Sequence, residues 1–243
     1  LEAVHDSVRS ARPGGLSRSA PWWDALFGEV EMYLGGGRRQ LALVHRDDRG
    51  RPDGYAIYVV DEDWSRGQAN HTLDVWELIG EDVGVEVALW RALVQHDLVA
   101  TVTGAIAVDH ALWDVVVDAR QVASRWEQDL LWVRVLDVPA ALAARRYGAA
   151  DALVLSIRDP FLGRAEGTFR LETDAQGVAH CSPHDGPADL ELDVADLGST
   201  LLGGTSLRRL QRAGRIGVAT ADAAARFDAM ASVDPAPWCW VRF

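Results

Sequence analysis

One short segment of the sequence combines residue types that bind metals. Its candidate ligands are His180, Cys181, His184 and Asp185. Nitrogen, sulfur and carboxylate ligands suit zinc, but zinc sites normally take four ligands from two separated pairs. The sequence offers no second Cys or His pair to complete the set. A polar surface turn is the better interpretation, and we expect no metal.

Two glycine-bearing segments could cradle phosphate. Gly35-Gly36-Gly37-Arg38-Arg39 offers backbone N–H groups beside arginines, and Gln211 to Gly217 has part of the glycine spacing of a pyrophosphate loop. A phosphate loop needs a strand before it and a helix N-terminus after it. Each of these segments is expected to follow a helix instead. We therefore interpret both as turns that end helices.

A basic face is predicted on the helix around residue 210. Arg208, Arg212 and Arg215 are spaced at i, i+4 and i+7, Arg209 lies beside them, and no acidic residue occurs from 197 to 221. Such a face could meet a phosphate or an acidic partner chain. A solvated helix face is the simpler interpretation.

The C-terminal tail, from Pro235 to Phe243, is too apolar for a free chain end. Trp238, Trp240 and Phe243 fall within six residues, and exposing them would create a patch of the size that marks binding sites. Chain ends fray unless they are tied down, so we expect this tail to be buried. Desolvation raises the pKa of a carboxylate, which can make it a useful base. From the residues alone, docking without chemistry is the simpler interpretation.

The first half of the chain reads as a mixed α/β unit. Residues 12–21 are rich in Pro, Gly and Ser and predict a linker. Apolar spacing then predicts a helix over 22–33 and a largely buried helix over 83–97. The predicted strands are 40–45, 55–61, 72–79 and 98–108.

A second α/β unit is predicted from about residue 130. It opens with a strand over 131–136, followed by a helix that Asp137 caps, that carries Pro139 in its first turn and that Gly148 closes. Further strands are predicted at 152–158, 167–173, 178–182 and 189–194, and helices at 197–202, 206–213 and 222–231.

Composition narrows the class of protein. The chain has 243 residues, which suits one large domain or two smaller ones. Its net charge of -12 argues against nucleic acid as a partner and suits cationic ligands. No apolar run approaches the length of a membrane span, and two cysteines cannot build a disulfide framework. We therefore expect a cytoplasmic protein with no membrane partner. The chain starts at Leu1 without a signal-peptide pattern, and we expect a further segment upstream.

Several stretches resemble the enhanced intracellular survival (Eis) family of GNAT-type N-acetyltransferases, from bacteria. The matching stretches are Pro13-Gly14-Gly15 with Trp22-Trp23; Leu89-Trp90-Arg91 with Leu93 and Asp97-Leu98-Val99; Trp132 to Leu142; Asp159-Pro160-Phe161; Leu202-Gly203-Gly204; and Ala236-Pro237-Trp238-Cys239 with the terminal Phe243. The resemblance covers essentially the whole chain. The strand-plus-helix stretch and the terminal motif together are fairly specific.

The resemblance implies an α+β fold made of two domains. A degenerate GNAT-like mixed sheet with helices, lacking a coenzyme site, would occupy residues 22–129. A sterol carrier protein-like α/β domain with the tail would occupy 130–243. Residues 1–21 would be a linker left by an upstream catalytic domain. That upstream domain would bind acetyl-CoA as co-substrate, so this chain alone is expected to be inactive.

The resemblance also assigns site residues and partners. The α-carboxylate of Phe243 would be the general base for an amine substrate, with Trp240 and Arg242 beside that substrate. Aminoglycosides are the expected polyamine substrates, and a homo-hexamer is the expected assembly. Arg242 departs from the acidic residue that aminoglycoside-acetylating members can carry at this position, and an arginine there would repel a polyamine. The alternative function is a sterol carrier-like module that binds an apolar ligand or serves as an oligomerisation scaffold.

Overall fold

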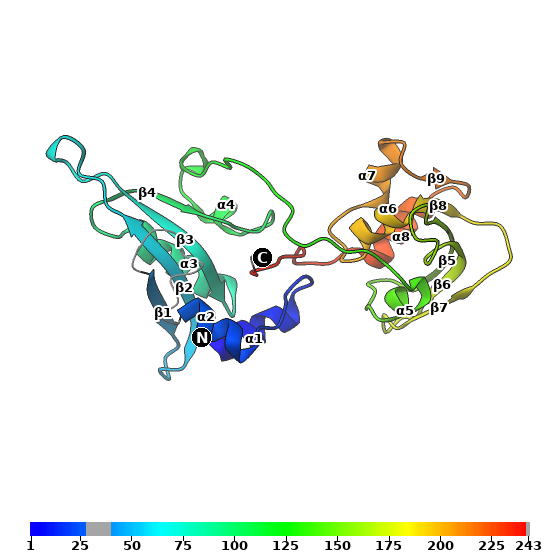
Figure 1. Ribbon diagram of the computed structural model, residues 1–243, viewed down its shortest axis with the longest axis horizontal. Helices are drawn as coiled ribbons and strands as arrows, with labels where there is room; N and C mark the ends of the chain where they lie inside the picture. The colour runs from blue at the N-terminus through cyan, green and yellow to red at the C-terminus, as the bar shows by residue number, and fades with distance from the viewer. Residues whose placement is uncertain (28–39, 242–243) are drawn as a thin grey trace. The chain divides into compact units, whose positions relative to one another are not determined.

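A computed structural model describes residues 1–27 and 40–241 of the chain (Figure 1). The chain divides into two compact units: residues 1–128 together with the tail from Trp238 onward, and residues 129–237. The tail was predicted to belong to the second domain, but from Trp238 onward it clusters with the first unit. Each unit has its own sheet.

The first unit is a four-stranded mixed sheet with helices on both faces (Figure 1). Its elements are α1 (Glu2–Ala11), α2 (Ala20–Phe27), β1 (Gln40–Arg46), β2 (Pro52–Asp61), β3 (His71–Gly80), α3 (Val83–Val94), β4 (Val99–Gly104) and α4 (Leu112–Val115), with 3-10 turns at Ser65–Gly67 and Ala119–Gln121. The sheet order is β1-β2-β3-β4, and α3 is the crossover that makes β4 parallel to β3.

A β-bulge in β3 decides which residues face α1. Tyr58 pairs with Val75 and Ile57 pairs with Glu77, so Trp76 is the extra residue of the bulge. Side chains alternate between the two faces of a strand, and one inserted residue reverses that alternation. As a result Val75 packs in the α3 core, while Glu77 lies on the face that carries Ile57 and α1.

Most predicted elements of this unit are confirmed, with two differences. The strands 40–45, 55–61 and 72–79 and the helix at 83 are present, and the last strand ends at Gly104. Residues 1–21 were predicted as a linker, but α1 is a helix that buries Val4 and His5. Leu1 supplies no side-chain cap, so the usual sequence signal for a helix start is missing. Residues 28–33 and Gly35-Gly36-Gly37 lie outside the described residues.

The second unit contains a five-stranded sheet of order β7-β6-β5-β8-β9 (Figure 1). Its buried apolar residues form one continuous core. Its elements are α5 (Val138–Ala143), β5 (Asp151–Arg158), β6 (Gly167–Thr173), β7 (Ala179–Pro183), β8 (Leu190–Asp193), α6 (Val194–Thr200), α7 (Leu207–Arg212), β9 (Gly217–Val218) and α8 (Ala223–Ala231). The predicted cap is confirmed, because the Asp137 carboxylate accepts the Ala140 N–H at 3.0 Å.

The strand predicted at 131–136 is wrong. This segment pairs with no strand among the described residues, and Trp132 is 83% exposed. Only Val135 is buried in the core of the second unit. A strand requires a hydrogen-bonded neighbour, which apolar patterning alone cannot supply.

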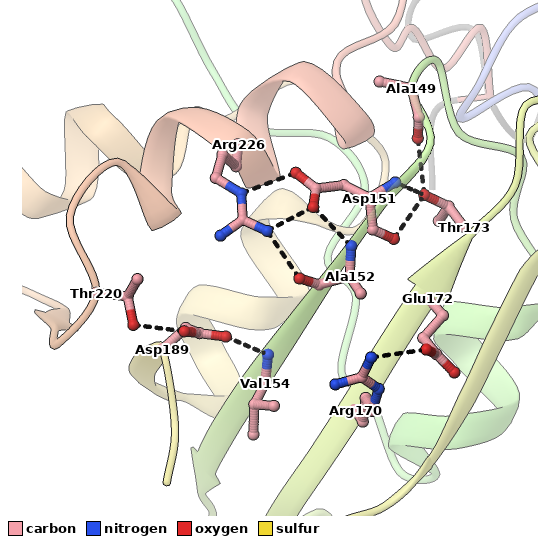
Figure 2. A network of polar contacts seen from close by, with 10 residues as sticks. All are labelled: Ala149, Asp151, Ala152, Val154, Arg170, Glu172, Thr173, Asp189, Thr220 and Arg226. Carbon is pink, nitrogen blue, oxygen red and sulfur yellow. Dashed lines mark hydrogen bonds and ion pairs between the residues drawn. The ribbon is translucent and has the colours of Figure 1, made fainter.

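A polar network joins α8 to the sheet of the second unit (Figure 2). Arg226 Nε and Nη2 donate to the two oxygens of Asp151 at 2.8 and 2.5 Å. Asp189, directly before β8, accepts the Val154 N–H of β5 at 2.8 Å and the Thr220 hydroxyl at 2.5 Å. It therefore connects β5 to the segment that follows β9. The hydrogen bond from Arg226 holds the pKa of Asp151 below its ordinary value.

Within the described ranges, no helix is long and apolar enough to cross a membrane.

Candidate functional site

The tail is buried against the α1 face of the first unit. Trp240 is 9% exposed and Val241 is 1% exposed. Trp240 packs with Tyr55 and Ile57 of β2, and Trp238 packs on the same cluster. The burial predicted for the tail from its composition is therefore confirmed for Cys239, Trp240 and Val241, whereas Trp238 is half-buried and Pro235 is exposed.

The segment between α1 and α2 holds the tail backbone. The Trp238 N–H donates to the Pro13 carbonyl at 2.9 Å. Gly14 has a φ of +90°, and a Cβ at this position would lie 3.0 Å from the Trp238 carbonyl oxygen. A side chain here would meet both backbone strain and the tail, so glycine allows the close approach.

A buried ion pair lies beside the tail. Arg18 Nη1 donates to Glu77 Oε1 at 2.9 Å, and its Nη2 contacts Glu77 Oε2. The same Nη2 donates to the Trp240 carbonyl at 3.3 Å. The Tyr55 hydroxyl donates to Glu77 Oε1 at 2.6 Å. We call Arg18, Glu77 and Tyr55 the Arg18 cluster.

Electrostatics keep Arg18 charged and the Tyr55 hydroxyl protonated. The side chains of Arg18 and Glu77 are 2% and 6% exposed. Burial opposes the charge on Arg18, but the hydrogen bond and negative charge of Glu77 outweigh it and keep the Arg18 pKa above its ordinary value. Burial and the Glu77 charge raise the pKa of Tyr55 far above its usual range, so its hydroxyl remains a donor. A buried pair of this kind keeps its geometry because either charge alone would be costly.

Trp23 covers the Arg18 cluster on one side, and His5 packs against Trp23. The Arg18 guanidinium lies over the Trp23 ring, 4.9 Å from its centroid. The His5 ring meets Trp23 edge to face. Burial, then the Arg18 charge, lower the pKa of His5, which favours the neutral ring.

A small cavity borders the two tail tryptophans. It has a volume of about 20 Å³, room for about one water molecule, and Trp90 and His110 line it with Trp238 and Trp240. The Trp90 Nε1 has no hydrogen-bond partner among the described residues. His110 Nε2 lies 3.3 Å from Glu86, while its Nδ1 accepts the Leu112 N–H at 3.0 Å.

The β3–α3 turn has the strand-before-helix order that a phosphate loop needs. However, Asp82 caps α3 and accepts the Val85 N–H at 2.9 Å. Glu81 and Glu86 add negative charge at the same helix end. An anion would have to displace the cap and face these carboxylates, so this turn is unsuited to a pyrophosphate.

The sequence candidates in the second unit do not assemble into a site. Cys181 is buried on β7, where burial raises the pKa of its thiol to about 11. No group of three or more metal-binding side chains gathers in the parts of the chain that the structure describes. Among the basic residues, Arg208 pairs with Asp228 at 3.1 Å and Arg215 with Asp196 at 2.7 Å. The predicted basic face is thus partly neutralised by acids from outside residues 197–221.

The segment from Gln211 to Gly217 ends a helix, as expected. Gly214 has a φ of +69° directly after α7. Its N–H donates to Gln211 and the Arg215 N–H donates to Leu210, which is a Schellman ending. The carbonyls, rather than N–H groups, need partners at such an end, so it is not a phosphate site.

Of the predicted site residues, Trp240 lies in the described tail, whereas Arg242 and Phe243 lie outside the described residues. Sequence reasoning missed Arg18 and Glu77. One signal was available: Glu77 is a charged residue in the otherwise apolar strand 75–79. Arg18 lies in a segment interpreted as a linker, and nothing local indicates its burial.

Family models match both halves of the chain. Residues 14–135 match an acetyltransferase (GNAT) domain, and residues 138–240 match a sterol carrier protein domain. An uncharacterized N-acetyltransferase of Streptomyces griseus is 35% identical over 243 residues, which cover 97% of this chain and 57% of the relative. N-acetyltransferase Eis of Mycobacterium tuberculosis is 34% identical over 237 residues, covering 96% of this chain and 54% of the relative.

Solved structures agree with these matches. Eis1 from Mycobacterium abscessus superimposes with a TM-score of 0.81 at 29% identity, covering 100% of this chain and 59% of that one. A GCN5-related N-acetyltransferase from Anabaena variabilis has a TM-score of 0.77 at 19% identity, a likeness of fold alone.

The chain is therefore an α+β protein with a GNAT-like domain followed by a sterol carrier protein-like domain. It belongs to the Eis family of GNAT N-acetyltransferases. It spans slightly more than half the length of the curated relatives it matches.

Proposed function

We propose that this chain is the C-terminal portion of an acetyl-CoA-dependent amine N-acetyltransferase. The observation that carries the proposal is the docked tail, whose last described residues Trp240 and Val241 are buried on a GNAT-like domain. In this proposal the GNAT-like domain spans 22–129 and the sterol carrier protein-like domain starts at 130. An upstream domain binds acetyl-CoA. The capped, acidic turn before α3 supports a domain without its own coenzyme site.

In the proposed reaction, the substrate amine must lose a proton before or as it attacks the thioester carbonyl. The α-carboxylate of Phe243 takes that proton, directly or through a water. The C–N bond forms and the C–S bond breaks. The nitrogen, positively charged after its attack, gives its remaining extra proton to the departing thiolate, so coenzyme A leaves as the thiol, and the proton held by the carboxylate passes to solvent. Trp240 and Arg242 flank the amine, so the docked tail would present base and substrate contacts together.

The proposed substrates are aminoglycoside-type polyamines. The charge of -12 supports a cationic substrate, because an acidic protein concentrates cations near its surface. Arg242 works against the most highly charged polyamines, so monoamines and less charged aminoglycosides should be better substrates. The proposed assembly is a homo-oligomer, a hexamer by family likeness.

Two assays test this function. The isolated chain is incubated with acetyl-CoA and kanamycin, and thiol release is followed; we expect none above background. The full-length protein is then compared with a variant that carries a few extra C-terminal residues. Loss of one general base costs about 10²–10⁴-fold in rate, so the extension should reduce kcat by that factor. Full kcat with the tail still docked would place the base elsewhere.

The alternative, a carrier of apolar ligands, has the sterol carrier protein domain match in its favour. In the second unit, however, the apolar faces of the sheet and of α6 and α8 pack into one cluster, with Leu155, Leu192 and Leu197 fully buried. A packed core of this kind favours a structural role. Binding of a fluorescent fatty acid to the chain at micromolar concentration would instead support the carrier function.

A further inference from the structure

We propose that Arg18 is a positioning residue that sets the register of the C-terminal tail, and hence the place of the Phe243 carboxylate. This inference rests on the proposed function for its catalytic consequence. Its structural part concerns only the described residues of the first unit.

Glu77 orients the guanidinium group of Arg18. Both guanidinium Nη atoms contact the Glu77 carboxylate, and the Trp23 ring covers one face of the guanidinium plane. Bidentate pairing and stacking fix both the position and the plane of an arginine. Tyr55 donates to Glu77 in turn, so the carboxylate has little freedom to rotate.

Arg18 Nη2 also contacts the backbone of the tail. Nη2 carries two protons; one faces Glu77, and the contact to the Trp240 carbonyl uses the other. The acceptor is a main-chain oxygen. This contact therefore fixes which tail residue lies opposite Arg18, whatever side chain that residue carries. Apolar packing of Trp240 is non-directional and tolerates a shift along the chain.

How far the terminus can move depends on where the tail is anchored. The Trp238 N–H and the Trp240 carbonyl are directional contacts two residues apart, to Pro13 and to Arg18. Phe243 follows Trp240 by three residues, which span at most about 10 Å. Without the Arg18 contact, the last directional anchor to another segment among the described residues is at Trp238, and the reach to the terminus grows to roughly 17 Å. A base that must lie within hydrogen-bond reach of its proton cannot tolerate that extra freedom.

The bulge in β3 supports a specific role for this pair. Without Trp76 as the extra residue, the alternation that buries Val75 under α3 would turn Glu77 toward the same face. The irregularity thus places a carboxylate under the tail instead of inside the α3 core. Bulges often re-aim a side chain in this way at functional sites.

The test uses Arg18→Lys, which keeps the positive charge but loses the fork. Its control is Arg51→Lys, because Arg51 also pairs with a glutamate through both Nη atoms, Glu81 at 2.8 and 2.9 Å. This pair is more exposed than the Arg18 pair, and among the described residues Arg51 does not contact the tail. The folded chain is treated with a carboxypeptidase that prefers aromatic termini, and release of Phe243 is followed by mass. A denaturant titration of each variant measures global stability in parallel.

We expect Arg18→Lys to release Phe243 about tenfold or more faster than the parent chain, because a charge-assisted hydrogen bond is lost. Arg51→Lys should stay within about twofold. Tyr55→Phe, which frees Glu77 to rotate, should give an intermediate rate. An unchanged release rate in Arg18→Lys, or an equal increase in Arg51→Lys, would overturn the role of Arg18.

A second readout uses the full-length enzyme. Arg18→Lys should lower kcat with little change in the KM for acetyl-CoA, whereas a general loss of structure would affect both. The release assay does not depend on acetyl transfer, so it tests whether Arg18 anchors the tail independently of the proposed catalytic role. If release accelerates while the C-terminally extended enzyme keeps full kcat, Arg18 anchors the tail but the proposed role of the carboxylate fails.

Discussion

The ring of His5 meets the ring of Trp23 edge to face, with 5.3 Å between their centroids and 90° between their planes. Both His5 nitrogens are buried and have no hydrogen-bond partner among the described residues. Asp6 is the nearest carboxylate partner recorded, and its Oδ1 is 3.8 Å from Nδ1, too far for a hydrogen bond. The ring packs well, but its two unpaired buried nitrogens lower the free energy of unfolding.

The first prediction is that His5→Phe stabilises the chain. Phenylalanine keeps the edge-to-face contact and removes the unpaired nitrogens, which cost about 1–3 kcal/mol when buried. We expect a gain of about 1 kcal/mol in the free energy of unfolding at pH 7, measured by urea denaturation. A loss of stability would mean that the nitrogens are hydrogen-bonded in solution.

The same substitution should change the pH dependence of stability. The His5 pKa is lowered in the folded state, so between that value and about 6.5 the unfolded chain binds a proton that the folded chain does not. Stability should therefore fall as pH falls through this window, and His5→Phe should remove that part of the slope. His180→Phe, at an exposed site, is the control and should leave the slope unchanged.

Arg145 closes two helix ends in the second unit. Its Nη1 donates to the Leu201 carbonyl at 2.7 Å, just after α6, and its Nη2 donates to the Ala231 carbonyl at 2.5 Å, at the end of α8. Burial lowers the pKa of Arg145, yet two helix C-termini supply the negative partial charge that it faces. The guanidinium takes the place that a glycine cap or water would otherwise fill.

The second prediction is that Arg145→Met destabilises the chain by about 2–3 kcal/mol. Methionine fills similar volume but leaves these carbonyls without their donor. Arg146→Met, at the exposed neighbouring position, should change stability by less than about 0.5 kcal/mol. Urea titrations of both variants make the comparison, and equal effects would contradict the capping role.

The third prediction concerns the ion pair between Asp151 and Arg226 (Figure 2). The Asp151 pKa is lowered by its hydrogen bond to Arg226, so its stabilisation is present above about pH 4 and is lost as pH falls through the lower folded value. Asp151→Asn should cost about 1–2 kcal/mol at pH 7 and flatten the acid slope of stability. Glu172→Gln, in the exposed Arg170 pair, should do neither. An unchanged acid slope in Asp151→Asn would show that other carboxylates govern acid unfolding.

The elements predicted correctly from sequence are those whose signals lie in neighbouring residues, and the features that were missed depend on contacts distant in sequence. The strand Gly167–Thr173 and the Asp137 cap depend on residues close in sequence, and both are found as predicted. The failed strand at 131–136 has suitable apolar residues, but its pairing depends on the rest of the fold. Arg18 and Glu77 are 59 residues apart in sequence, so their contact follows from the β3 bulge and from the path between α1 and α2. Family likeness supplied the tail's proposed role, while composition alone predicted its burial.

The last prediction separates the burial of the tail from the stability of the fold. Trp240→Ala removes a ring that packs on Tyr55 and Ile57. Truncation of a buried tryptophan costs about 3–5 kcal/mol in a core. A chain end can detach locally, so the loss should appear mainly as tail release, with a smaller change in global unfolding. Hydrogen exchange resolved to Trp238–Val241 should rise at least tenfold, while exchange in β2 changes little. Trp64→Ala, at an exposed site, is the control. Equal acceleration in β2 and in the tail would show that the tail is part of the global folding core.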